Sequence, residues 1–307
     1  MKSSNIGGQA VLEGVMMRNK EKYAVAVRKP DGDIAVMHDT YKSAIKWKKL
    51  TTIPFVRGTF NFFDSLILGM KTLNYSASFY EDESEEIITE QDQKKKERKD
   101  RIFTAVTMVF SMALAIGAFM ILPYFLVLLL ENWITSPLIQ VILEGAIRIG
   151  IFVGYIYLVS FMKDIRRTFM YHGAEHKCIN CIERGMPLNV ENVRNSSKVH
   201  KRCGTSFIFF VLIISMICLF FVQVDTVWMR VVVRIALLPI IAGISYELIK
   251  WAGNSENPII GMLSKPGLWM QALTTKEPED DMIEVAIASV EEVFDWRTYI
   301  EENRNDA

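Results

Sequence analysis

Two histidines four residues apart form the part of this sequence best suited to chemistry. They lie in the pentapeptide HGAEH at residues 172–176. Side chains at this spacing share one face of a helix, so His172 and His176 can bind one metal ion. Glu175 lies beside them and completes the H-x-x-E-H spacing of inverted zincins, in which the glutamate is the general base. The pentapeptide therefore indicates water activation by Zn2+ or another divalent metal.

A catalytic zinc ion needs a third protein ligand and an open fourth position. The sequence offers three candidates for that ligand: His200, Cys203 and Glu247. Each lies close to the end of a predicted membrane span, and the predicted topology brings all three to one membrane face. Arg202 is a candidate for binding an anionic substrate. Glu183 is a candidate for orienting the metal ligands through hydrogen bonds.

Two other interpretations of the same residues stay open on spacing alone. Cys178-x2-Cys181 followed by His200-x2-Cys203 has the spacing of a zinc knuckle, in which four ligands close a structural site. Alternatively, the histidines are polar residues at a helix end and the thiols bind nothing. Spacing gives the catalytic metal, the structural metal and the metal-free interpretation similar support.

Four apolar stretches must position these residues. Half of the 307 residues are hydrophobic, and the formal net charge of zero gives no global support for nucleic-acid binding. Crossing a bilayer takes about 20 apolar residues. The sequence predicts four such spans, at about 102–130, 138–162, 205–223 and 229–249. The chain is therefore expected to be a multi-pass protein of the cell membrane, with the lipid bilayer as its partner.

Lysine and arginine placement predicts the orientation of these spans. The loop at 163–204 contains nine of these residues, whereas the turns at 131–137 and 222–229 contain none. Because positively charged loops stay in the cytoplasm, the loop at 163–204 is predicted to be cytoplasmic. Four spans then place both termini in the cytoplasm as well.

Three charged residues fall inside the predicted spans. Glu144 and Arg148 are four apart in the second span, and Arg234 lies deep in the fourth. Because a charge in lipid is costly, we expect these residues to face protein and to pair with one another. Buried ionisable groups also mark transport pathways, so a small transporter stays among the alternatives.

The first 80 residues are expected to form a small cytoplasmic α+β region. Strands are predicted at Tyr23–Val27 and Ile34–Met37, and a helix at Ser43–Leu50. The apolar segment at 55–79 is predicted to be a helix, either at the membrane interface or in a domain core. The segment GGQAVLEGVMMR at 7–18 is interpreted as a tight turn that packs under the membrane domain.

Within that turn, Glu13 and Arg18 are polar residues in an apolar context, and they are candidates for supporting the site. The remaining domains follow from composition. Residues 81–101 are expected to be a charged linker, 102–249 the membrane domain, and 250–307 a cytoplasmic tail. An amphipathic helix that begins near 277–281 is expected to dock on the N-terminal region or on the membrane surface.

Four segments resemble the YqhQ-like family of bacterial membrane proteins, and the resemblance extends over nearly the whole chain. They are GGQAVLEGVMMR at 7–18, YHGAEHK at 171–177, HKRCGTSF at 200–207 and PGLWMQALTTKEPEDDMIEVAI at 266–287. The family carries a domain of unknown function that is sometimes described as a predicted metal-dependent enzyme. Its pattern includes positions that match His172, Glu175, His176, His200, Arg202, Cys203 and Gly204, and it features no cysteine pair at 178 and 181. The resemblance thus implies a site built on the two histidines of the pentapeptide.

The sequence predicts a mainly α, polytopic helical bundle of about four spans, with a small α+β N-terminal region and a C-terminal amphipathic helix. The leading functional hypothesis is a metal-dependent hydrolase at the cytoplasmic face, acting on a membrane-proximal substrate. The alternative is a non-enzymatic membrane adaptor that binds a protein partner and uses the polar or zinc cluster to hold its helices. A small transporter is the third hypothesis.

Overall fold

The structure is a computed structural model that describes residues 3–43, 53–80, 90–200, 203–221, 224, 226–253 and 258–304. It divides into two compact units. The sheet unit comprises Met1–Tyr80, Ile156–Val211 and Pro239–Ala307. The apolar unit comprises Glu81–Tyr155 and Leu212–Leu238. The helix predicted at Ser43–Leu50 falls almost entirely on residues outside the described ranges, as do Arg202 and the acidic half of the charged linker.

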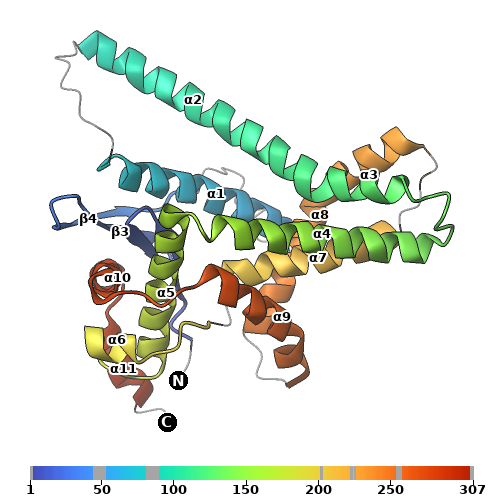
Figure 1. The fold of residues 1–307 in the computed structure, drawn as a ribbon. Coiled ribbons are helices and arrows are strands. Elements are labelled where there is room, and N and C mark those ends of the chain that lie inside the picture. Colours follow the sequence, from blue (N-terminus) through green and yellow to red (C-terminus); the bar gives the residue numbers. More distant parts are fainter. Residues whose placement is uncertain are drawn as a thin grey trace. The chain divides into compact units, whose positions relative to one another are not determined.

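An antiparallel sheet in the order β1-β2-β3-β4 forms the centre of the sheet unit (Figure 1). Its strands are β1 (Ile6–Val11), β2 (Gly14–Asn19), β3 (Lys22–Arg28) and β4 (Ile34–Thr40). The strands predicted at 23–27 and 34–37 are confirmed as parts of β3 and β4.

The interpretation of residues 7–18 as a tight turn is wrong, because this segment is the β1–β2 hairpin. Val11 pairs with Gly14, and Glu13 in the two-residue loop has φ 48°. The strand was hidden because β2 is buried on both faces, and such strands lack the alternation of apolar and polar residues. Val15 and Met17 join one core cluster, whereas Met16 joins the other.

Helices cover both faces of this sheet. The larger core lies between the sheet and α5 (Lys163–Glu183), α6 (Val190–Arg194) and α10 (Asp280–Val293). On the opposite face, Leu68 of α1 (Val56–Ala77) packs with Val11, Tyr23 and Val25. The amphipathic C-terminal helix is confirmed as α10, and its apolar face packs on β2 and β3. α9 (Pro258–Thr274) precedes it and α11 (Trp296–Arg304) follows it.

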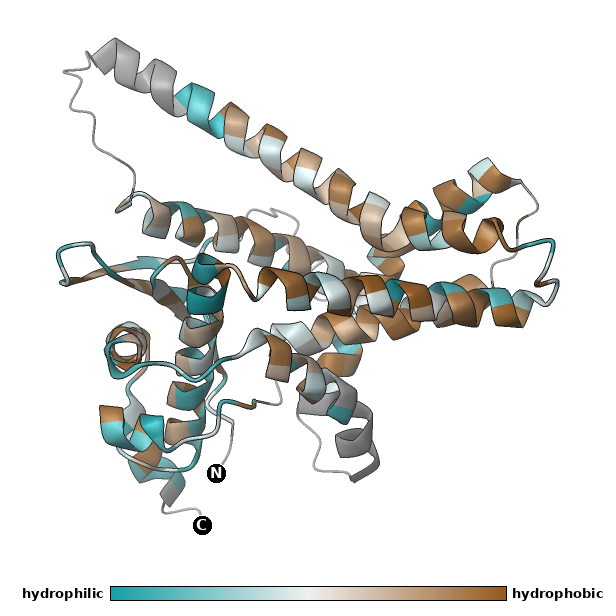
Figure 2. Ribbon diagram, in the orientation of Figure 1, coloured by the Kyte–Doolittle hydropathy of each residue, from teal (hydrophilic) through white to brown (hydrophobic). Residues whose placement is uncertain are grey.

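The long apolar helices are α2 (Glu90–Ile116), continued by a π-helical turn at Gly117–Ile121 and by α3 (Leu122–Leu128), then α4 (Pro137–Val159), α7 (Gly204–Phe221) and α8 (Val227–Gly253). Among the described helices, three stretches are long and apolar enough to cross a membrane: Arg98–Leu128, Pro137–Val159 and Val227–Trp251. Most of the residues in these helices are hydrophobic (Figure 2). The predicted span at 205–223 contains a shorter apolar helix, Phe207–Phe221.

Candidate metal centre

α5 carries the two histidines of the pentapeptide on the face next to its core face. The core face is formed by Tyr171, Ala174, Cys178 and Ile182, which are all fully buried. His172 and His176 lie one turn apart, and their ring centroids are 4.4 Å apart. The helix therefore presents both imidazoles to the same small volume, as the i, i+4 spacing predicts.

The side chain of His172 is oriented by the backbone at the C-terminal end of α9. Its Nδ1 lies 2.9 Å from the carbonyl oxygen of Thr274. A carbonyl oxygen can only accept a hydrogen bond, so Nδ1 is the donor, which in the neutral ring leaves the lone pair on Nε2. A Cβ on Gly173 would lie 2.0 Å from the carbonyl oxygen of Lys276. Only glycine at position 173 therefore lets this segment come close enough to reach His172.

His176 is oriented in the same way by a different segment. Its Nδ1 lies 2.6 Å from the carbonyl oxygen of Lys198, which again leaves the lone pair on Nε2. The loop that offers this carbonyl is fastened to α5 by Lys177, whose Nζ donates to the carbonyl oxygens of Arg194 and Ser196. The carboxylate of Glu277 pairs with both Lys177 and Lys198, at 3.0 and 3.2 Å.

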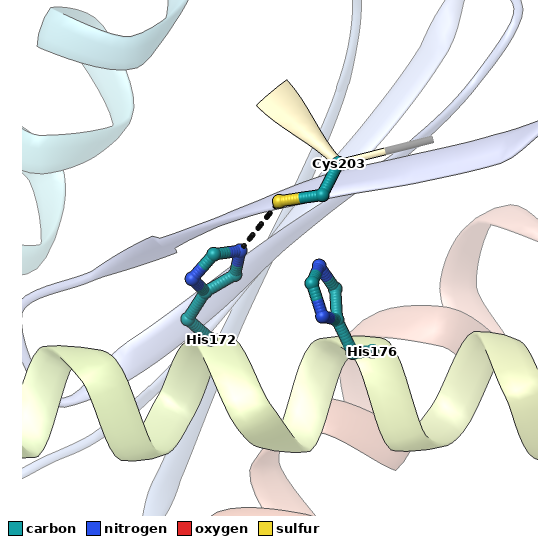
Figure 3. A group of neighbouring side chains, drawn as sticks. All are labelled: His172, His176 and Cys203. Carbon is teal, nitrogen blue, oxygen red and sulfur yellow. Dashed lines mark hydrogen bonds between the residues drawn. The ribbon is translucent and has the colours of Figure 1, made fainter. Parts of the chain in front are cut away.

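Cys203, directly before α7, completes a group of three potential ligands (Figure 3). Its Sγ lies 3.3 Å from Nε2 of His172. One ligand atom from each of Cys203, His172 and His176 lies within 4.8 Å of the others. A tetrahedral zinc ion with Zn–N and Zn–S bonds of about 2.0 and 2.3 Å holds its ligand atoms about 3.4 Å apart. A small inward shift of these side chains would thus suffice to hold zinc.

Two other predicted ligands are not part of this group of three. Glu247 lies in α8 and forms two hydrogen bonds of 2.6 Å with Arg57, so its carboxylate is already paired. His200 is a neighbour, with its ring centroid 5.7 Å from that of His176. Its Nε2 faces Glu183 at 3.6 Å, and Glu183 also accepts hydrogen bonds from the backbone and hydroxyl of Ser4.

The four-ligand zinc knuckle is not assembled in the described residues. Cys178 and Cys181 are fully buried in the core between α5 and the sheet. Burial raises the pKa of the Cys178 thiol well above its ordinary value, which opposes the thiolate that a metal requires. The two cysteines therefore serve as small apolar core residues.

Glu175 points from α5 toward β1. It is 5% exposed, and a Cβ on Gly8 would lie 2.9 Å from its Cγ. Glycine at this position therefore lets the strand pass close to the carboxyl group. Burial raises the pKa of Glu175, while His172 and a hydrogen bond from the Gly8 backbone act in the opposite direction. The result is a buried carboxyl group beside His172 that favours holding a proton.

Glu13 and Arg18 have roles other than supporting the ligand group. Glu13 accepts hydrogen bonds from Arg167 at 2.6 Å and from the hydroxyl of Tyr171 at 3.2 Å. Arg18 donates to the carbonyl oxygen of Lys20 and lies over the ring of Tyr41. Both residues fix the hairpin to its surroundings.

Sequence reasoning missed the residues that orient the two imidazoles. Thr274 and Lys198 act through backbone carbonyl oxygens, which carry no side-chain signature. Lys177 and Glu277 could have been noticed, because both lie in the segments that resemble the YqhQ-like family. Without coordinates, nothing indicates that they fasten a loop.

In the apolar unit, the three predicted intramembrane charges lie together. Arg148 donates to one carboxylate oxygen of Glu144 at 2.6 Å, and Arg234 donates to the other at 2.7 Å. Exposed fractions of 3–8% show that all three residues are buried. In Figure 2, hydrophilic residues interrupt the mostly hydrophobic ribbon of α4.

Comparison with known proteins gives two findings. A family model described as "Protein of unknown function (DUF1385)" matches residues 53–296. The chain is also 39% identical over 301 residues to "Uncharacterized protein YqhQ" of Bacillus subtilis (strain 168), which covers 97% of this chain and 95% of that protein. No solved structure matches the chain.

Proposed function

The chain belongs to the DUF1385 family, whose function is unknown, and from the geometry of its own residues we propose that it is a membrane-bound, metal-dependent hydrolase. The proposed metal is zinc, held by His172, His176 and Cys203. Three helices that could cross a membrane support the association with a bilayer. The proposal includes the finer topology of four spans with both termini and the metal site in the cytoplasm.

One observation carries this proposal. Two imidazoles are locked in the same tautomer by two backbone carbonyl groups, so that both Nε2 lone pairs and one thiol meet in one place. Metal-ligating histidines characteristically donate their other N–H to a backbone carbonyl or a carboxylate. A structural role for these histidines alone does not require the two lone pairs to converge.

The donor set decides the kind of metal and the kind of chemistry. Two imidazole nitrogens and one thiolate suit zinc, and three protein ligands leave a fourth position for water or substrate. Zinc bound there would act as a Lewis acid and would make water a nucleophile near neutral pH. Glu175 would hold the proton that the attacking water gives up, and its buried, proton-favouring environment fits this role.

The substrate is proposed to be membrane-proximal. Cys203 is followed directly by α7, whose stretch Phe207–Phe221 is apolar, so the metal site lies at the start of an apolar helix. Arg202, next to Cys203 in sequence, is proposed to steady an anionic group of that substrate.

Metal content of the purified full chain tests the site. We expect about one zinc ion per chain by elemental mass spectrometry, falling more than tenfold in His172→Ala, His176→Ala and Cys203→Ser. His38→Ala and Cys218→Ser are matched controls that should keep the metal, because His38 pairs with Glu292 and Cys218 lies in α7. A parent protein without metal, or variants that keep it, would remove the basis of the proposal.

A structural zinc site in a non-enzymatic adaptor is the second candidate, and burial favours it. Cys203 and His176 are only 6% and 1% exposed. A metal there would join α5 to the start of α7 without needing access for a substrate.

The substitution Glu175→Gln separates the two functions. Zinc-dependent release of p-nitrophenol from a p-nitrophenyl ester should disappear in this variant, while zinc content and folding stay unchanged. Unchanged turnover in Glu175→Gln would favour the adaptor. The adaptor would also be favoured if the zinc-loaded parent shows no turnover and Glu175→Gln does not alter any cellular role.

A further inference from the structure

A second group of ionisable residues, in the apolar unit, borders a cavity that the proposed hydrolase does not use. The cavity has a volume of about 230 Å3 and lies among α3, α4, α7 and α8. Its lining includes the buried Glu144 and Arg234 and the more exposed Glu131 and Arg230. Tyr124 also borders it.

The charges around this cavity do not cancel. Glu144 is the shared partner of two buried guanidinium groups, those of Arg148 and Arg234, so this cluster carries one excess positive charge. The pair of Arg230 and Glu131, 3.7 Å apart, adds no net charge. This count covers the described residues; Asp225, two residues before α8 in the sequence, lies outside them.

An excess charge at this depth is expensive. Glu144 is seven residues into α4 and Arg234 seven into α8, which places them about 10 Å from the helix starts at 1.5 Å per residue. Both helices are apolar enough to cross a membrane. Ionised side chains in such surroundings require a partner of opposite charge.

Two polar atoms in the same cluster lack a partner. The hydroxyl of Tyr124 and Nε of Arg148 are buried and form no hydrogen bond with the described residues. Tyr124 is only 4% exposed, and the guanidinium carbon of Arg234 lies 4.0 Å from the centroid of its ring. The ring that carries this unpaired hydroxyl therefore lies against Arg234, and both residues line the cavity.

We propose that this cavity binds a singly charged oxyanion, either a carboxylate or a phosphate ester. The anion would balance the excess guanidinium charge and accept a hydrogen bond from Tyr124. Arginine suits this role because its planar group donates several hydrogen bonds to carboxylate or phosphate oxygens. The same chemistry could come from a free solute or from the headgroup of an anionic phospholipid.

Calorimetric titration of the full chain tests the proposal. The protein is placed in nanodiscs of zwitterionic phosphatidylcholine in low-chloride buffer and titrated with acetate or with inorganic phosphate at pH 6. Saturable binding of either anion to the wild-type protein is expected. In a second arm, nanodiscs contain phosphatidylglycerol. Loss of solute binding there, with a raised Tm, identifies the lipid headgroup as the source, whereas unchanged solute binding identifies a free anion.

Two variants keep the fold and probe the site. Arg234→Gln leaves Glu144 with Arg148 as a neutral pair, so the protein should stay folded while anion affinity falls at least tenfold. Tyr124→Phe should lower affinity several-fold without changing any charge. Arg101→Gln and Tyr155→Phe are the matched controls, because Arg101 and Tyr155 are exposed and do not line the cavity.

Two results would overturn the proposal. Wild-type protein that binds acetate, phosphate and phosphatidylglycerol no better than Arg234→Gln would mean that the cluster only holds helices together. Anion binding that is absent from the wild-type protein but gained in Asp225→Asn would mean that the chain supplies the balancing charge itself.

Discussion

The two units treat their polar residues in opposite ways. In the sheet unit, each of the two histidines of α5 has Nδ1 within hydrogen-bond distance of a backbone carbonyl oxygen, which leaves Nε2 available. In the apolar unit, both carboxylate oxygens of Glu144 accept hydrogen bonds from guanidinium groups. A site that presents lone pairs therefore contrasts with a cluster organised around charge compensation.

The difference follows from what each environment demands. Burying a neutral imidazole costs little free energy once its N–H group has an acceptor, so its second nitrogen can stay free to bind a ligand. A formal charge among apolar helices needs an opposite charge close by. The comparison predicts that single substitutions affect the two units through different mechanisms and by different amounts.

The largest effect is expected in the apolar unit. Glu144→Gln leaves two buried guanidinium groups facing each other without a carboxylate, which should cost about 3–5 kcal/mol. Unfolding of the purified protein in detergent measures this loss. Glu131→Gln is the control, because its pair is partly exposed and should contribute less than about 1 kcal/mol. Equal effects of the two substitutions would contradict the claim that the buried charges depend on Glu144 more than a partly exposed pair depends on Glu131.

In the sheet unit, close packing rather than charge should give the largest effect. Gly173→Ala places a methyl group 2.0 Å from the carbonyl oxygen of Lys276, a backbone atom that cannot rotate away. We expect a loss of about 1–3 kcal/mol and weaker zinc binding, because Thr274 moves away from His172. Gly7→Ala is the control, with no atom near its added methyl group. A stable Gly173→Ala variant with unchanged zinc affinity would show that this close approach is dispensable.

A pH effect of intermediate size should come from Glu175. Burial raises its pKa, so the folded protein binds more protons than the unfolded chain between the ordinary and the raised pKa. Stability therefore falls as pH rises through that interval. In metal-free protein, Glu175→Gln should flatten this part of the stability profile. Thermal unfolding of both proteins from pH 4 to pH 8 measures these profiles. Parallel profiles for the wild-type protein and Glu175→Gln would contradict the burial argument.

The smallest effect is expected for an exposed ion pair of the sheet unit. Arg194 and Asp280 form hydrogen bonds, but both side chains are 54% exposed, so water and salt screen the pair. Arg194→Ala should leave Tm unchanged within error, both with and without added salt. A clear drop in Tm at low salt would mean that this pair helps to hold α6 against α10.

The sequence predicted several elements because their signals are local. The strands at 23–27 and 34–37, the apolar helices and the amphipathic helix α10 all follow from periodicity and turn residues. The β1–β2 hairpin was not predicted, because β2 is apolar on both faces and its partner strand β1 is rich in glycine. Gly8 and Gly173 each permit a close approach to another segment, and the sequence alone does not show which segment that is.

For the candidate site, spacing by itself determined that His172 and His176 share a helix face, because a helix repeats every 3.6 residues whatever surrounds it. The proposal of Cys203, rather than Glu247 or His200, as the third ligand rests on the tertiary structure, since the partners of these side chains come from distant segments. The tautomers were likewise decided by the carbonyl groups of Thr274 and Lys198. Backbone carbonyls are common to every residue, so only the fold shows which of them reaches an imidazole.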